Sequence, residues 1–180
     1  MHQLSPLIEL VHHRWSVPAL ALLQQQRGAK FITMVNMLGV SRDSLRRTLR
    51  ALIAAELVVN NPGYGHPMRP EYVLTPRGQQ IGSLALPLAN ALRKRSVTVY
   101  KKWSLPTIAA LAAMPRSFNA LKRELGAASP RAVSLTLKDL EADGLVHRHV
   151  EETHPPTVSY QLSRSGKRLA PLVIDLAEAL

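Results

Sequence analysis

The sequence contains no cysteine, and aromatic residues make up only 4% of it. Without a thiol, this chain cannot form disulfides, thiolate zinc sites or a thiol-based redox sensor. Long apolar runs are also missing, because the two most apolar stretches, 81–92 and 169–180, are about 12 residues each. A helix that spans a bilayer requires roughly 20 residues. We therefore expect no transmembrane helix and no membrane partner.

Acidic residues are scarce as well. The chain has 12 Asp and Glu against 23 Lys and Arg, which gives a net charge of +11. Such a charge favours a polyanionic partner, either nucleic acid or an anionic membrane surface. Residues 1–6 lack the basic start and the small-residue cleavage site of a signal peptide, so we expect a cytoplasmic, nucleoid-associated protein.

The chain carries an internal repeat. Residues 15–18, Trp-Ser-Val-Pro, return 88 positions later as Trp-Ser-Leu-Pro at 103–106. Phe31 and Phe118 match at an offset of 87, which requires one compensated single-residue gap. The offset of 88 also joins a collinear series of pairs: Ser41 with Ser129, Leu45 with Val133, Leu49 with Leu137, Leu52 with Leu140, Leu57 with Leu145, Tyr72 with Tyr160 and Gly78 with Gly166.

This repeat predicts a tandem duplication. A chain of 180 residues is long enough for two small domains of roughly 90 residues each. We predict a first copy at 1–92, a basic linker at 93–102 and a second copy at 103–180.

Turn and capping residues predict the elements of the second copy. Ser104 should cap a first helix, 116–118 should be extended, and a second helix should carry Leu121 and Leu125. After a tight turn at 126–128, Ser129 should cap a third helix. Two helices joined by a short glycine-containing turn form a helix-turn-helix.

A wing should follow that third helix. Gly144 ends the helix, 145–150 and 158–162 are expected to form a hairpin, and Ser163 should cap a last helix. The first copy repeats the order, with a longer wing tip at 60–70 and a last helix that starts at Thr75-Pro76. The predicted fold is mainly α with small β-wings (α+β): a winged helix-turn-helix domain, α-α-α-β-β-α, present twice.

Several of these motifs resemble the HxlR-type family of winged-helix regulators. The resemblance covers nearly the whole second copy, above all residues 137–148 and 155–166, and in the first copy residues 38–41 and 72–78. The first copy departs from the pattern at Glu56 and Asn60, which stand where the second copy has Gly144 and Arg148, so a DNA contact of its wing stays open. The family often carries a cysteine near its start, and this chain has none. The resemblance implies that the copies form an intramolecular pseudo-dimer, since members usually work as homodimers of single domains.

The third helix of each copy is the expected recognition helix. If its leucines point into the core, the opposite face of the first copy is strongly cationic. Arginine can bond a guanine edge in the major groove, and lysine or serine can anchor phosphate. A solvated charged face is the alternative. The candidate DNA-contacting residues are Ser41, Arg42, Asp43, Arg46, Arg47 and Arg50, and in the second copy Ser129, Arg131, Ser134, Leu135 and Lys138.

Basic residues outside these helices are further candidates. Arg69 in the first wing, and Arg148, His149 and His154 in the second, could meet phosphate or the minor groove. The linker clusters 93–95 and 101–102 could follow the DNA backbone. Simple surface exposure is the alternative for all of them.

The last helices are more apolar than a lone small domain needs. We expect them to pack together across a pseudo-two-fold axis, with the recognition helices about 34 Å apart, one turn of DNA. Pro87 should kink the first of them and make the pair asymmetric. Further association of two chains stays open, as does an effector.

Histidines raise the question of a metal site, especially His147 and His149 with His154, or His12 with His13. Neither group has a carboxylate or thiolate at suitable spacing, so we expect no metal. The chain has no nucleophile elbow, no phosphate-binding glycine loop and no catalytic His/Asp/Ser grouping. We expect no cofactor and no enzymatic activity.

These features favour a sequence-specific regulator of transcription that binds double-stranded DNA, with repression favoured over activation. The two recognition faces differ, so the expected operator is an imperfect palindrome. The alternative is a winged-helix interaction module whose basic charge meets an acidic protein.

Overall fold

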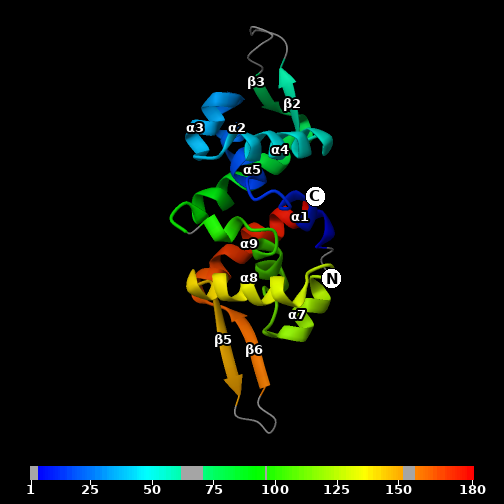
Figure 1. The fold of residues 1–180 in the computed structure, drawn as a ribbon, viewed down its shortest axis with the longest axis vertical. Helices are drawn as coiled ribbons and strands as arrows, with labels where there is room; N and C mark the ends of the chain where they lie inside the picture. The colour runs from blue at the N-terminus through cyan, green and yellow to red at the C-terminus, as the bar shows by residue number, and fades with distance from the viewer. Residues whose placement is uncertain (1–3, 62–70, 96, 152–156) are drawn as a thin grey trace.

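The structure is a computed structural model that describes residues 4–61, 71–95, 97–151 and 157–180 (Figure 1). The first copy comprises α1 (Ser5–Leu10), α2 (Ser16–Gln26), β1 (Ala29–Lys30), α3 (Phe31–Leu38), α4 (Arg42–Ala54), β2 (Val58–Asn61), β3 (Glu71–Leu74) and α5 (Pro76–Leu92). The second copy comprises the 3₁₀ helix η1 (Val97–Tyr100), α6 (Ser104–Ala110), β4 (Arg116–Ser117), α7 (Phe118–Glu124), α8 (Pro130–Ala142), β5 (Val146–Glu151), β6 (Thr157–Leu162) and α9 (Arg164–Glu178). From α2 onward the element order of the first copy returns from α6 onward, which confirms the duplicated fold.

Each copy contains a small antiparallel sheet of three strands, ordered β1-β3-β2 and β4-β6-β5. The registers match, because Ala29 pairs with Tyr72 and Arg116 pairs with Tyr160. The predicted order α-α-α-β-β-α therefore lacked one short strand between the first two helices. The extended piece expected at 116–118 is shorter than predicted, since Phe118 already begins α7.

Serine caps begin both helices that were expected to recognise DNA. The Ser41 hydroxyl accepts the Ser44 N–H at 3.3 Å, and the Ser129 hydroxyl accepts the Ala132 N–H at 3.2 Å. The prediction that Ser104 caps a helix was wrong. Ser104 is the first residue of α6, and its hydroxyl instead donates to the Thr98 carbonyl at 3.0 Å. A hydroxyl at that position therefore ties α6 to η1.

The single-residue gaps of the repeat fall in loops and at a helix end. Helix α2 has 11 residues and α6 has 7. In the turn of the helix-turn-helix, Gly39 and Gly126 both adopt left-handed backbone conformations, with φ of 60° and 54°. One residue separates Gly39 from the cap Ser41, but two separate Gly126 from Ser129. The longer turn restores the offset of 88 before α8 begins.

A repeated hydroxyl cap ties the starts of α5 and α9 to the turns that follow α4 and α8. The Ser163 hydroxyl donates to the Gly144 carbonyl at 2.7 Å and accepts the Gly166 N–H at 3.0 Å. In the first copy, the Thr75 hydroxyl donates to the Glu56 carbonyl at 2.7 Å and accepts the Gly78 N–H at 2.9 Å. We refer to these two sets of contacts as the hydroxyl caps.

Glycine is required three residues after each cap. A β-carbon at Gly78 would collide with the backbone carbonyl of Leu57, and one at Gly166 would collide with that of Leu145. The same carbonyls accept hydrogen bonds from the Thr75 N–H at 3.1 Å and the Ser163 N–H at 2.9 Å. Close approach of backbone to backbone therefore fixes where α5 and α9 start.

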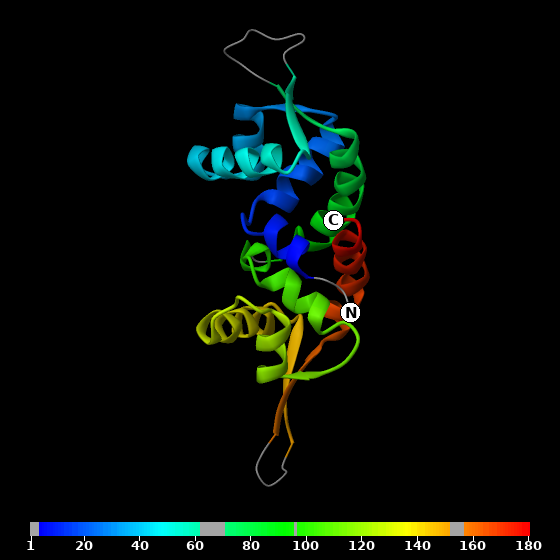
Figure 2. The same cartoon turned by 90° about the vertical axis from the view of Figure 1, so that its right-hand side faces the viewer.

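The two copies are packed against each other. Helix α5 packs on α9, and α1 of the first copy packs on α6 and α9 of the second (Figure 2). Arg77 on α5 also donates to the Leu180 carbonyl at 3.2 Å. The expected pairing of the last helices is confirmed. The sequence attributed the asymmetry of this pair to Pro87 alone. That explanation was incomplete, because α9 also contains a proline, Pro171, at a different position of the repeat.

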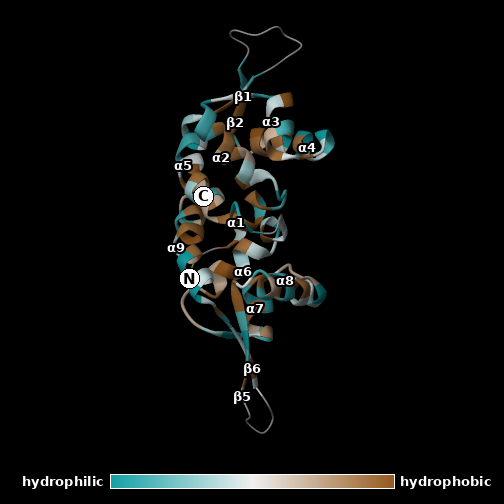
Figure 3. Cartoon of the chain, turned by 90° about the vertical axis from the view of Figure 1, so that its left-hand side faces the viewer, coloured by the Kyte–Doolittle hydropathy of each residue, from teal (hydrophilic) through white to brown (hydrophobic). Residues whose placement is uncertain are grey.

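The elements that could meet DNA share one side of the molecule. In Figures 2 and 3, α4 and α8 project to the same side, while α5 and α9 lie on the opposite side. The strands β2–β3 and β5–β6 stand at the two ends of the long axis (Figure 1). Within the described ranges, none of the helices has the length and apolar character needed to cross a membrane.

Replacing Gly166 with Ala should lower the free energy of unfolding by roughly 2 kcal/mol, because the new methyl group must displace backbone. The better helix propensity of Ala, about 1 kcal/mol, offsets only part of this cost. Urea denaturation of the full chain measures the change. Ser165→Ala, at the neighbouring half-buried position, serves as the control and should be nearly neutral. Equal stability of both variants would contradict the close packing.

Replacing Glu56 with Gly should stabilise the chain by about 1 kcal/mol. Glu56 is exposed and has φ of 58°, where the second copy has Gly144 at 66°. A side chain in this left-handed conformation is strained, and glycine relieves the strain. The reciprocal change, Gly144→Ala, should cost a similar amount, since no atom lies within 4 Å of the added carbon. Thermal unfolding of both variants tests the pair, and a loss of stability in Glu56→Gly would refute it.

Candidate nucleic-acid interface

Helix α4 presents a cationic face to solvent. Leu45, Leu49 and Leu52 are buried at 0%, 2% and 1% exposure, as the sequence pattern predicts. The opposite face consists of exposed side chains that were all proposed as DNA contacts from the sequence: Ser41, Arg42, Asp43, Arg46, Arg47 and Arg50. An amphipathic helix of this kind leaves its charged side free for a partner.

Neighbouring groups hold part of this face in place. Arg46 donates to the Asp43 carboxylate at 2.8 Å and lies over the Phe31 ring at 6.0 Å. Arg47 donates to the Asp43 carbonyl at 3.4 Å. Within the part of the chain that the structure describes, Arg50 has no hydrogen-bond or ion-pair partner. Asp43 therefore orients two arginines, while Arg50 is left available.

Helix α8 carries a different face at the matching positions. Arg131 and Lys138 are exposed, Ser134 is half-buried, and Leu135 is 51% exposed. Val133, Leu137 and Leu140 face the core. Figure 3 shows hydrophilic residues at the projecting ends of both α4 and α8. The second face thus combines two cations, a cap hydroxyl at Ser129 and an apolar side chain.

The structure describes only some of the candidate DNA-contacting residues of the wings. Arg148 is exposed on β5, opposite Tyr160 in the register, and His149 next to it is also exposed. The corresponding residue of the first wing, Asn60, is exposed opposite Tyr72. The candidates Arg69 and His154 lie outside the described residues.

The linker cations divide into two groups. Arg95 donates to the Asp143 carbonyl, and Lys101 pairs with Asp139 at 2.7 Å, so both stabilise the second copy. Arg93 and Lys94 are exposed. The interpretation of these clusters as simple surface charge is therefore incomplete, because two of their members join the linker to α8 and the turn after it.

Basic residues from separate parts of the chain meet between α4 and the linker. Arg47 and residues 101–102 were proposed separately as DNA contacts, but the sequence predicted neither Arg14 nor the grouping. His12, His13 and Arg14 precede α2, and they line a concavity of 460 Å³ together with Arg47, Lys101 and Lys102. Burial, His12 and Arg47 lower the pKa of His13. We call this set the central basic pocket. A further signal in the sequence is the basic residue before each repeated tryptophan, Arg14 and Lys102.

Comparison with known proteins identifies the family. A family model described as HxlR-like helix-turn-helix matches residues 10–94 and again residues 98–179. The chain belongs to this family. The double match also confirms the duplication, since each half of the chain satisfies the model by itself.

Curated relatives are named as regulators. Over 63 residues the chain is 40% identical to the uncharacterized HTH-type transcriptional regulator YybR of Bacillus subtilis (strain 168), covering 35% of this chain and 50% of that protein. Over 78 residues it is 40% identical to the uncharacterized HTH-type transcriptional regulator BH0655 of Halalkalibacterium halodurans, covering 43% of this chain and 69% of that protein. The chain thus spans about half the length of YybR. A solved structure described as the redox regulator HypR in its oxidized form is 32% identical, with a TM-score of 0.45, over 51% of this chain and 91% of that one.

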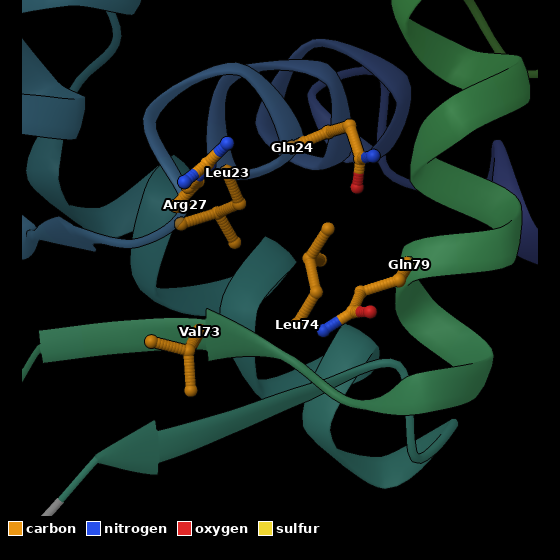
Figure 4. Close-up of a pocket in the computed structure, with 6 residues that line it drawn as sticks. All are labelled: Leu23, Gln24, Arg27, Val73, Leu74 and Gln79. Atoms are coloured by element: carbon orange, nitrogen blue, oxygen red, sulfur yellow. The ribbon is translucent and has the colours of Figure 1, made fainter.

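Another cavity lies away from the cationic face. Figure 4 shows Leu23, Gln24 and Arg27 from the end of α2 and the residue after it, Val73 and Leu74 from β3, and Gln79 from α5 around a space of 300 Å³. No residue of α4 lines it. The repeat places Ala112, Pro115 and Lys167 where the first copy has Gln24, Arg27 and Gln79. This polar set is therefore particular to the first copy.

Metal ligands do not gather in the described ranges. There, no three His, Asp or Glu side chains come together as a group that could hold a metal ion. His147 and His149 project from the same strand, β5, and both are exposed.

Proposed function

We propose that this chain is a sequence-specific DNA-binding regulator of transcription in which one polypeptide supplies both recognition helices. The main support is the exposed cationic face of α4, on the same side of the molecule as α8 (Figure 2). The family and the names of its relatives agree with this function. Since the last helices pack together, the tandem copies act as an intramolecular pseudo-dimer.

The two helices read different sequences. Where α4 has Asp43, Arg46, Arg47 and Arg50, helix α8 has Arg131, Ser134, Leu135 and Lys138. Two arginines can each bond a guanine edge, whereas an exposed leucine can contact a thymine methyl group. The preferred operator is therefore an imperfect palindrome with its half-sites about one turn of DNA apart.

Repression is the mode of action that we favour. A protein that occupies two adjacent major grooves blocks a promoter sterically without any further activity. The chain has no cysteine, so any signal it answers does not act through a thiol of this chain.

Selection from a random duplex library with the full chain is the first experiment, because it yields the operator. Replacing Arg46 and Arg50 together with Ala should then weaken operator binding roughly tenfold per arginine, since each can contribute about 1–3 kcal/mol of base recognition. It should also lower the slope of log affinity against log salt, by about 0.9 for each phosphate that the variant no longer neutralises. Fluorescence anisotropy across a salt series measures both.

A matched control keeps the charge change equal. Arg164→Ala with Arg168→Ala also removes two arginines, from exposed positions on α9, which lies on the side away from α4 and α8 (Figure 3). This control should leave sequence preference unchanged. If no sequence is enriched and random duplex binds no better than polyglutamate, the chain is instead an interaction module for an acidic protein. Equal binding by the Arg46/Arg50 variant and the control would reject the α4 assignment.

A further inference from the structure

The central basic pocket lies where the two copies meet on the DNA-facing side. His12, His13 and Arg14 come from the first copy, Arg47 comes from α4, and Lys101 and Lys102 come from the segment before α6. Among the described residues, no carboxylate lines it. Four permanent cations and two histidines from separate segments therefore share one concavity.

Each copy contributes a cation that lies beside a tryptophan ring to this pocket. Arg14 and Lys102 occupy equivalent positions of the repeat, each directly before its tryptophan. The Arg14 guanidinium lies 5.4 Å from the Trp15 ring centre, and the Lys102 ammonium lies 4.8 Å from that of Trp103. Such cation–π contacts hold a side chain in place without neutralising its charge. The repeat therefore brings one fixed cation from each copy to the same place.

One of the four permanent cations is paired with a carboxylate, whereas Arg14, Arg47 and Lys102 have no ion-pair partner among the described residues. Asp43 on α4 pairs with Arg46, outside the pocket, and Asp139 on α8 pairs with Lys101 alone. Burial is the largest cause of the lowered pKa of His13, and the neighbouring His12 and Arg47 lower it further. An anion in the pocket would relieve the repulsion among these positive charges.

The placement of the pocket indicates which anion it meets. If α4 and α8 enter successive major grooves, the protein surface between them faces the intervening minor groove and its two flanking backbones. We propose that the central basic pocket binds backbone phosphates at the centre of the operator, as an anchor that is independent of sequence. This inference rests on the proposed function and adds a third point of DNA binding between the two recognition helices.

Replacing Arg14 and Lys102 together with Ala tests it. The expected result on the selected operator is a salt slope lower by about 1.8, because two phosphates are no longer neutralised. Affinity should fall by the same factor for operator and random duplex, since phosphates carry no sequence information. Phosphate ethylation at the operator centre should interfere with binding of the native chain and no longer with binding of the variant.

Two variants control for charge and packing. Lys167→Ala with Arg168→Ala removes one lysine and one arginine from exposed positions on α9 and should leave the central interference unchanged. Arg14→Lys with Lys102→Arg keeps both charges beside their tryptophans and should keep the native slope. If this swap lowers the slope as the Ala pair does, the pair acts through packing and the inference is overturned.

His13 gives an independent readout. Its pKa is held low in the free protein, and a nearby phosphate would raise it, so binding takes up a proton. Affinity should therefore rise as the pH falls from 8 to 6, by a larger factor for the native chain than for His13→Gln. His147→Gln, an exposed wing position, is the control and should behave like the native chain. An identical pH response of native chain and His13→Gln would count against the pocket.

The outcomes separate this inference from the function on which it rests. Suppose that the Arg14/Lys102 variant keeps the native salt slope, while the Arg46/Arg50 variant still has reduced affinity for the operator. The central basic pocket then does not bind backbone phosphates, but the proposed regulatory function stands. If the Arg14/Lys102 change weakens only the binding of inorganic phosphate and not that of DNA, the pocket binds a free anion. The inference is then overturned, and the proposed function again stands. If neither double variant alters DNA binding, the proposed function fails as well.

Discussion

The hydroxyl caps at Thr75 and Ser163 are the contacts on which the arrangement of this molecule depends. Each hydroxyl joins the turn after a recognition helix to the first turn of a last helix, through bonds of 2.7 Å to a carbonyl and 2.9–3.0 Å to a glycine N–H. The wing strands lie between these two points in the chain. Because the glycine backbone touches the carbonyl of Leu57 or Leu145, the recognition helix, the wing and the last helix of each copy hold one mutual orientation.

The orientation within each copy then sets the orientation between copies. The last helices, α5 and α9, pack on each other, and α1 crosses from the first copy to α6 and α9 of the second. With each recognition helix tied to a last helix, the α5–α9 contact places α4 and α8 on one side (Figure 2). A covalent link between the copies also lets their surfaces diverge, since no symmetry requires α4 and α8 to carry the same residues. The contrast between Arg47 and the exposed Leu135 is a consequence of that freedom.

Much of this architecture could be predicted from the sequence, because repeated Trp, Ser and Gly residues mark the same turns and caps in both copies. Local rules failed where a tertiary contact took over: the Ser104 hydroxyl bonds to Thr98 instead of capping its helix, and the strands β1 and β4 are too short, at 2 residues each, to leave a pattern. The sequence named Arg47 and residues 101–102 as candidates but did not predict the central basic pocket that brings them together. His13 and Lys101 are far apart in the chain, and they meet only because the copies pack in one particular way, which no local pattern encodes. The domain boundaries and the spacing of the recognition helices remain predictions.

We propose that one chain does what two subunits do in a homodimer. Native mass spectrometry of the full chain with a duplex that holds a single selected operator tests it most directly, when combined with hydroxyl-radical footprinting of the same complex. We expect one chain per duplex and protection of two half-sites about one turn of DNA apart. A complex that requires two chains for that same pair of half-sites, with a single chain protecting only one of them, would contradict it.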